Sequence, residues 1–288
     1  MELPGGRSEV VEVGGHRRHL WRAGDAGPLV LLVHGIPTDH TLWWDVVPRL
    51  QEHARVVAVD MLGFGASVAP PGAGVDIASQ AVALLDLLDV LGEERALVVG
   101  HDLGGGVAQI LATTSPQRLT GAVIVDGVCY DGWPVPAIKA MKLTWPAVER
   151  LPPQALGRLL GTALRPLFVH AERAPQAVQR FVAPWVEPGG GRRLARHLRS
   201  LDSVYTQAVA PFLPRVALPV EVVWGAQDSQ MKPRYGERLA REVPGAGFTL
   251  VQDAHHFVPV DRPDAVVDAV LRVLERAGSA RGGGRHVS

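Results

Sequence analysis

The chain has 288 residues, which fits one large domain carrying an inserted subdomain better than it fits two full domains. Its 29 Lys and Arg residues equal its 29 Asp and Glu residues, so it lacks the clustered basic excess of a nucleic-acid-binding protein. Cys129 is its single cysteine, which excludes an intrachain disulfide, and no apolar run has the roughly 18 residues that a membrane span needs.

The N-terminal half of the chain alternates between short apolar runs and helical patterns. Residues 1–13 lack the apolar segment of a secretory signal, so we expect a cytoplasmic protein without membrane association. Strand patterns at 10–13 and 16–23 flank Gly14-Gly15, which predicts a hairpin. Three continuous apolar runs typical of buried parallel strands follow, at residues 29–35, 55–60 and 96–102. Apolar residues at helical spacing predict two helices, at 77–91 and 103–114.

The C-terminal half repeats this alternation after one interruption. Strands are predicted at 121–127, 219–228 and 248–256, and a helix is predicted from about Pro263 to Glu275. Alternating strands and helices predict an α/β fold in which a mostly parallel sheet carries helices on both faces. The Gly- and Arg-rich end, residues 278–288, has no apolar periodicity and is predicted to be a disordered tail.

Residues 130–218 form the interruption, because they contain no clear strand pattern. Helical patterns in this stretch are separated by breaks at prolines and glycines, for example at Pro152 and Gly189. We therefore predict a helical cap over 130–218, inserted into a core made of residues 1–129 and 219–277.

The segment VVGHDLGGG, residues 98–106, combines the end of a strand, a tight turn and the start of a helix. Its G-x-D-x-G pattern, with Gly100, Asp102 and Gly104, corresponds to the G-x-S-x-G nucleophile elbow with a carboxylate in place of the serine. Small residues flank the central position because such a turn leaves no room for side chains. The alternative interpretation is a glycine-rich turn whose aspartate only caps the following helix.

Three further strand ends supply candidate partners for Asp102, because reactive residues of open α/β sheets lie at the carboxyl ends of the strands. In the motif HGIP, the backbone amide of Ile36 could form an oxyanion hole together with the amide of Leu103. Asp228 and His256 follow two later strands. The order nucleophile, acid, histidine is typical of α/β-hydrolases among the triad enzymes.

Four motifs in the correct order resemble the α/β-hydrolase superfamily, and within it the branch with an aspartate nucleophile, the epoxide hydrolases and haloalkane dehalogenases. HGIP is similar to the HGxP motif of epoxide hydrolases, DMLGFGAS to the D-x-x-G-x-G-x-S stretch, and GHDLGG to the aspartate elbow. HHF matches His256 to the family's catalytic histidine, although His255 occupies a position where glycine is common. The resemblance extends over residues of about 10 to 277. It implies an α/β-hydrolase fold and a triad of Asp102, Asp228 and His256, with no cofactor and no metal.

A carboxylate nucleophile changes the kind of carbon that the site attacks. Asp102 is ionised at neutral pH unless burial raises its pKa strongly. Attack on an ester would form a reactive anhydride, whereas attack on an sp³ carbon with a leaving group forms an alkyl ester that is stable enough to be an intermediate. His256 would then activate water against that ester. We expect a small apolar organic substrate, an epoxide or an alkyl halide, and an enzyme rather than a ligand receptor on the same scaffold.

The leaving group distinguishes the two substrate classes. The resemblance implies that an epoxide oxygen takes its proton from cap tyrosines, and Tyr205 lies near one expected position, while no tyrosine lies near the other. Haloalkane dehalogenases often hold halide with a Trp after the nucleophile and the Asn of HGNP, where this chain has Leu103 and Ile36. Epoxide hydrolysis is therefore the leading hypothesis, dehalogenation is the alternative, and a specialised ester or lactone reaction is a third.

Two further assignments keep an alternative. Asp126 ends the strand at 121–127, from which some dehalogenases draw the triad acid, so it competes with Asp228 for that role. Trp145 is a candidate for the lining of an apolar pocket, although cap tryptophans are as often plain core. The sequence specifies neither the identity of the substrate nor an oligomeric state.

Overall fold

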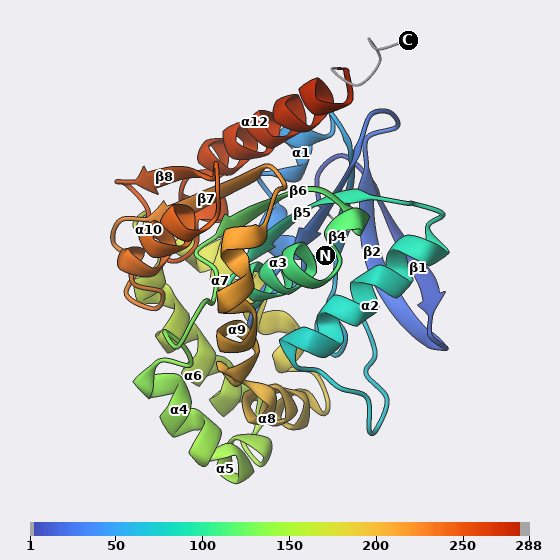
Figure 1. Cartoon of the computed structure of the whole chain (residues 1–288). Coiled ribbons are helices and arrows are strands. Elements are labelled where there is room, and N and C mark those ends of the chain that lie inside the picture. The colour runs from blue at the N-terminus through green and yellow to red at the C-terminus, as the bar shows by residue number, and fades with distance from the viewer. Residues whose placement is uncertain (1–2, 283–288) are drawn as a thin grey trace.

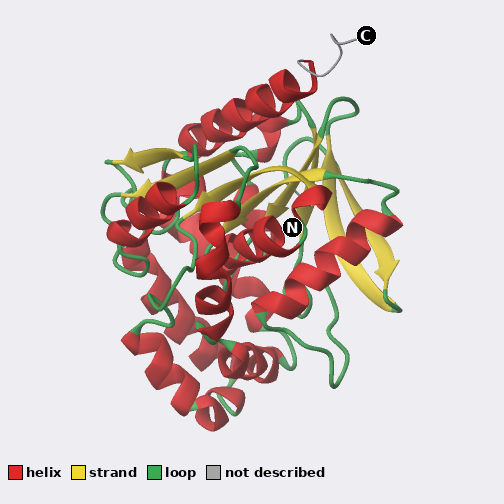
Figure 2. Cartoon of the chain, viewed as in Figure 1, coloured by secondary structure: helices red, strands yellow, loops and turns green. Residues whose placement is uncertain are grey.

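A single eight-stranded sheet forms the centre of the molecule, with helices on both of its faces (Figure 1, Figure 2). The computed structural model describes residues 3–282. The strands are β1 (Arg7–Val13), β2 (His16–Ala23), β3 (Leu29–Val33), β4 (Arg55–Val59), β5 (Ala96–His101), β6 (Leu119–Val125), β7 (Val220–Gly225) and β8 (Gly247–Val251). Their spatial order is β1-β2-β4-β3-β5-β6-β7-β8. All eight strands expected from the sequence are confirmed.

The sheet is parallel from β4 to β8 and antiparallel at the N-terminal hairpin. β1 pairs antiparallel with β2, and β2 pairs antiparallel with β4, while the other neighbours are parallel. The central strand β3 shows why the apolar runs are continuous. Leu31 and Val33 pack into the core on one face of the sheet, and Val30 and Leu32 pack into the core on the other. Alternate side chains point to opposite faces, so a strand covered on both sides needs apolar residues throughout.

Helices of the core divide between the two faces of the sheet. They are α1 (Val47–Leu50), α2 (Ile77–Val90), α3 (Leu103–Thr114), α10 (Pro233–Glu242), α11 (Val258–Asp261) and α12 (Pro263–Gly282). The helices α2, α3 and α10 contribute to the core on one face, and α1 and α12 contribute to the core on the other. The start of α2 is fixed by Asp76, whose carboxylate accepts hydrogen bonds from the amides of Ala78 and Ser79.

Between β6 and β7 the chain is helical, and we call this part the cap. Its α-helices are α4 (Pro136–Leu143), α5 (Trp145–Glu149), α6 (Pro153–Leu164), α7 (Ala174–Val182), α8 (Gly190–Ser200) and α9 (Val204–Val209). None of the residues 130–218 forms a strand. Figure 1 shows α4, α5, α6 and α8 gathered at the end of the molecule opposite α12. In α6 the buried residues Leu156, Leu160 and Leu164 recur every four positions, which gives the helix one apolar face.

The C-terminal helix is longer than the sequence pattern indicates. α12 continues to Gly282, so the prediction of a disordered tail is wrong for residues 278–282, and residues 283–288 of that predicted tail lie outside the described part. The stretch after Glu275 contains no proline, and the hydroxyl of Ser279 donates to the carbonyl of Glu275 one turn earlier, which lets the helix continue. Among the described helices, none is both long enough and apolar enough to cross a membrane.

Candidate active site

Asp102 occupies a sharp turn between β5 and α3. Its φ of 51° is positive, a conformation that costs energy for a residue with a side chain. The neighbouring glycines are required by space: a Cβ atom on Gly100 would lie 2.0 Å from the carbonyl oxygen of Gly104, and one on Gly104 would lie 2.1 Å from that of Val33. The Asp102 side chain makes no capping hydrogen bond to α3, so the helix-cap interpretation of this residue is wrong.

Backbone amides bind the carboxylate of Asp102. The amide of Ile36, in the loop after β3, donates to Oδ2 of Asp102 at 2.9 Å, and the nearby amide of Leu103 also lowers the pKa of this carboxyl. Burial raises the pKa of Asp102 to about 6, while the charge of His256 and the two amides oppose that rise. The nucleophile predicted from the sequence is therefore bonded to one of the two amides predicted to form an oxyanion hole, and the other lies beside it.

His256 is oriented by Asp228. Its Nδ1 lies 3.0 Å from Oδ2 of Asp228, whose other oxygen accepts hydrogen bonds from the amides of Gln230 at 2.7 Å and Met231 at 2.9 Å. Burial favours the neutral imidazole, but the carboxylates of Asp228, Asp102 and Asp126 outweigh it and raise the pKa of His256 to about 9. At neutral pH the imidazole of His256 is therefore protonated and positively charged, while the carboxyl group of Asp102 is mostly ionised.

Asp126, the alternative acid, lies close by but does not hold the imidazole. Its Oδ1 accepts a hydrogen bond from the amide of Gly225 at 2.8 Å, and its buried Oδ2 has no hydrogen-bond partner among the described residues. Burial and the neighbouring charge of Asp228 raise the pKa of Asp126 well above its ordinary value. In this geometry Asp228 is the acid bonded to His256, and Asp126 is bonded to the backbone of Gly225 instead.

A cavity of about 320 Å³ opens over Asp102 and His256. Its wall is built largely from apolar side chains of the cap, among them Trp133, Ile138, Met141, Leu160, Leu164, Leu194 and Leu198. Among the described residues, the wall has two polar side chains besides Asp102 and His256. They are the amide of Gln230 and the indole of Trp133. The indole N–H of Trp133 is not available to a ligand in the cavity, because it donates to the hydroxyl of Thr206 at 2.8 Å.

Two residues expected at the site lie elsewhere. Tyr205 sits on α9 beside Asp76 and Asp202 and does not line the cavity, and burial and these carboxylates raise the pKa of its hydroxyl. Trp145 packs under the guanidinium of Arg199 at 4.7 Å and is also absent from the cavity wall. Tyr205 faces Asp76 at the start of α2, and Trp145 faces Arg199 of α8. Both corrections have one cause: the order of the strands does not determine which way a cap helix turns its side chains.

Two other residues at the site were not singled out from the sequence. Gln230 reaches the cavity because it follows Asp228 by two positions, which is the only sequence signal for it. His101, the residue before the nucleophile, positions the backbone of His256, since its Nε2 donates to the carbonyl of His256 at 2.8 Å. The letters GHD in the elbow motif contain His101, but its partner lies far away in the sequence and is visible only in the fold.

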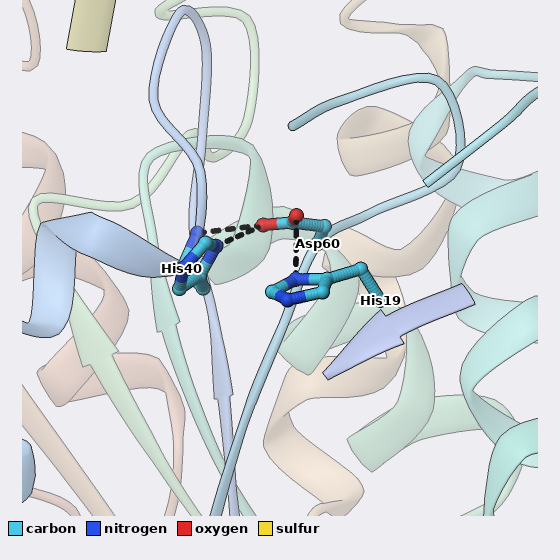
Figure 3. Close-up of side chains that lie close together, drawn as sticks. All are labelled: His19, His40 and Asp60. Atoms are coloured by element: carbon cyan, nitrogen blue, oxygen red, sulfur yellow. Dashed lines mark hydrogen bonds and ion pairs between the residues drawn. The ribbon is translucent and has the colours of Figure 1, made fainter. Parts of the chain in front are cut away.

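A second polar cluster lies outside the cavity (Figure 3). Nδ1 of His19 is 2.9 Å from one oxygen of Asp60, and Nδ1 of His40 is 2.8 Å from the other. The three side chains offer a donor set suited to a metal ion, with ligand atoms within 4.8 Å of one another. Each carboxylate oxygen, however, already accepts a backbone amide as well, from His40 or Ala66. The cluster is therefore complete as a hydrogen-bond network, which ties β2 to the loops after β3 and β4.

Comparisons with known proteins agree with this architecture. A family model described as "alpha/beta hydrolase fold" matches residues 28–263. The chain is 29% identical over 258 residues to haloalkane dehalogenase 2 of Mycobacterium tuberculosis, covering 85% of this chain and 87% of that protein. It is 28% identical over 280 residues to a soluble epoxide hydrolase of a Corynebacterium species, covering 90% and 94%. A solved alpha/beta hydrolase fold protein from Burkholderia ambifaria superimposes with a TM-score of 0.84 at 26% identity, covering 92% of this chain and all of that chain.

Proposed function

Since this chain belongs to the alpha/beta hydrolase fold family, we propose that it is an epoxide hydrolase that works through a covalent ester at Asp102. The observation that carries this proposal is the hydrogen bond from the Ile36 amide to the Asp102 carboxylate, 2.9 Å long. In a serine hydrolase the oxyanion hole receives the oxygen of the substrate. Here the hole holds the carboxylate of the enzyme itself, which is where a tetrahedral centre forms when water attacks an ester of Asp102.

The reaction has two steps. In the first, an oxygen of Asp102 attacks a ring carbon of the epoxide, the carbon–oxygen bond of the ring breaks, and the leaving oxygen takes up one proton. In the second, water attacks the ester carbonyl of Asp102 and gives one proton to His256, the diol leaves, and the Asp102 carboxylate is restored. Asp228 keeps Nδ1 of His256 occupied throughout, so Nε2 is the nitrogen that exchanges protons.

His256 can balance both protons without a tyrosine. None of the three tyrosines of the chain lines the cavity, whereas His256 does and carries a proton at neutral pH because its pKa is raised to about 9. Donation of that proton to the leaving oxygen leaves a neutral imidazole, which is the form that activates water. Esterification also removes the negative charge of Asp102, one cause of the raised pKa, so the proton is released more readily at that stage.

The wall of the cavity supports an uncharged, apolar substrate and favours an epoxide over a halide. Apart from His256, which is already paired with Asp228, no cationic side chain of the described residues lines the cavity, so a substrate carboxylate or phosphate would lose its hydration without gaining a free ion pair. A departing halide needs N–H donors, but the indole of Trp133 is already bonded to Thr206, and the side-chain amide of Gln230 donates to the hydroxyl of Ser229 at 3.3 Å. The haloalkane dehalogenase relative, at 29% identity, keeps alkyl halides as the second candidate class of substrate.

Labelled water tests the covalent mechanism. Over repeated turnovers of an apolar terminal epoxide in H₂¹⁸O, the peptide that contains Asp102 should gain ¹⁸O, because water attacks the carboxyl carbon of the enzyme. The Asp102→Asn variant should form no diol and gain no label. Turnover by the wild-type protein without label in Asp102 would contradict the ester mechanism. Bromoalkanes of the same chain length, assayed in parallel for bromide release, show whether halide is the preferred leaving group.

A further inference from the structure

A tryptophan of the cap is bonded to the loop that carries the oxyanion hole. Trp185 ends the short 3₁₀ helix η4 (Ala183–Trp185), is 2% exposed, and donates its indole N–H to the carbonyl oxygen of Pro37 at 2.6 Å. It is not part of the cavity wall. This indole is therefore buried at the seam between cap and core, where it touches the backbone of the site and no substrate.

The carbonyl that Trp185 binds belongs to the residue next to Ile36. Pro37 follows Ile36, whose amide holds Oδ2 of Asp102 at 2.9 Å. On the other side of Ile36, the carbonyl of Gly35 accepts hydrogen bonds from the amide and the hydroxyl of Thr38, both within the same loop. The Pro37 carbonyl is thus the atom of this loop that accepts a hydrogen bond from the cap.

The indole ring has little freedom to release that grip. It stands edge-on to Phe64 at 5.8 Å and to the ring of His197 at 6.0 Å, and Nε2 of His197 donates to the carbonyl of Gly63 at 3.1 Å. On the backbone side, a Cβ atom at Gly190 would lie 1.8 Å from the carbonyl oxygen of Trp185, so α8 begins directly against it. Phe64 and Gly63 of the core, together with Gly190 and His197 of the cap, therefore fix the direction of the N–H group.

We infer that Trp185 is a positioning residue for the oxyanion hole: with the cap packed on the core, its indole N–H fixes the Pro37 carbonyl and thereby the amide of Ile36. Packing of the cap and assembly of the hole are then one event. The inference rests on the proposed function for the identity of the group held in the hole. It adds that the cap, besides shaping the cavity, takes part in the electrostatics of both chemical steps.

The size of the expected effect follows from what is removed. Loss of an oxyanion-hole donor costs on the order of 10²–10³-fold in kcat. Trp185→Phe keeps the donor and loosens its support, so we expect a smaller loss in kcat, about tenfold. KM should change by less than about twofold, because Trp185 does not line the cavity.

A matched control separates this role from general anchoring of the cap. Arg196 on α8 also bonds the cap to the core, because its guanidinium donates to the carbonyls of Ala69 and Pro70 at 2.9 Å each. These carbonyls lie in the loop after β4 and not in the loop that carries Ile36. Arg196→Gln should therefore lower Tm at least as much as Trp185→Phe while keeping kcat within about twofold of the wild type. Three measurements are compared: kcat and KM for an apolar epoxide, decay of the alkyl-enzyme by intact-protein mass spectrometry, and hydrogen exchange of the Ile36 amide.

The expected result is slower decay of the alkyl-enzyme and faster exchange of the Ile36 amide in Trp185→Phe, with neither change in Arg196→Gln. The inference is overturned if Trp185→Phe keeps wild-type kcat, if its Ile36 amide exchanges at the wild-type rate, or if Arg196→Gln loses kcat to the same extent. If the wild-type protein forms no alkyl-enzyme, the proposed function fails. The exchange rate of the Ile36 amide in the two variants then still decides whether Trp185 supports the hole.

Discussion

At the scale of single residues, the choice between two acids depends on one hydrogen bond. Asp228 and Asp126 are both buried near His256, but only Asp228 is bonded to its Nδ1, at 3.0 Å. Chain order alone left both in place, because each follows a parallel strand and the carboxyl ends of neighbouring strands meet at one edge of the sheet. The direction of a side chain at such an edge depends on its turn, which the sequence pattern does not contain.

Substitution of each acid by its amide tests this assignment. Asp228→Asn should reduce kcat by about 10²–10⁴-fold, since the imidazole loses both its orientation and the charge that holds its proton. Asp126→Asn should stay within about tenfold of the wild type, because Asp126 is bonded to the amide of Gly225 and not to the imidazole that it would have to orient. The measurement is steady-state hydrolysis of the same epoxide, and a larger loss in Asp126→Asn than in Asp228→Asn would reverse the assignment.

The fold brings together the candidate residues that lie in strand–turn motifs, whereas it places the two cap candidates away from the cavity. Asp102, Asp228 and His256 follow from strand–turn motifs, whose geometry is local. Tyr205 and Trp145 were assigned by position along the cap, but their directions depend on how several short helices pack against each other. A helix rotated by one residue, about 100°, turns a side chain from the cavity to solvent, and no motif in residues 130–218 fixes that rotation.

At the scale of elements, the elbow depends on the close approach of α3 to β3. Val33 is the last residue of β3, and its carbonyl oxygen lies only 2.1 Å from the position that a Cβ atom on Gly104 would take. The glycines after Asp102 thus bring the first turn of α3 against the end of the neighbouring strand, which aims the Leu103 amide at the nucleophile. The sequence pattern predicted this turn correctly because glycine in such a motif reports directly on missing space.

Two glycine-to-alanine substitutions in helices should therefore have opposite effects. Gly104→Ala should lower the free energy of unfolding by at least about 1–3 kcal/mol, because backbone atoms cannot move aside as a flexible side chain can. Gly161→Ala, in α6, meets only Val178 at 3.7 Å and should raise it by about 0.5–1 kcal/mol through helix propensity. Urea unfolding measures both. A Gly104→Ala protein as stable as the wild type would show that the elbow has room to relax.

At the scale of the whole molecule, the charges of the site link its protonation to global stability. The pKa of His256 is raised to about 9 in the folded protein, against an ordinary value of 6.5. Because the folded pKa is the higher one, the stabilisation is complete below about pH 6.5 and is lost as the pH rises through 9. The difference corresponds to about 3 kcal/mol, since one unit of pKa is about 1.4 kcal/mol.

This linkage predicts a fall in the free energy of unfolding of about 3 kcal/mol between pH 6.5 and pH 9.5. The His256→Asn variant should lose most of that dependence, because it removes the group that titrates. Urea unfolding of both proteins at several pH values measures the slope. An equally steep slope in His256→Asn would assign the pH dependence to other groups.

The overall topology was predictable from the sequence, whereas the contacts between cap and core were not. Continuous apolar runs identified the central strands β3, β4 and β5, since burial on both faces leaves few other compositions, whereas the half-exposed β8 followed from the alternation of strands and helices. The seam is different: the Trp185 indole meets the carbonyl of Pro37 across 148 positions of the chain. Backbone carbonyls carry no sequence signature, so a bond between a side chain and a distant carbonyl leaves no mark in the pattern of residues.

The cap is one uninterrupted stretch between β6 and β7, and this continuity has an evolutionary consequence. A single recombination event can replace most of the substrate-facing wall while the reacting groups of the core are inherited unchanged, so new substrate preferences can arise without rebuilding the chemistry. The Trp185–Pro37 bond limits which replacements succeed. On the role inferred for Trp185, an incoming cap that lacks a donor for this carbonyl would shape a cavity but leave the loop of Ile36 without its support.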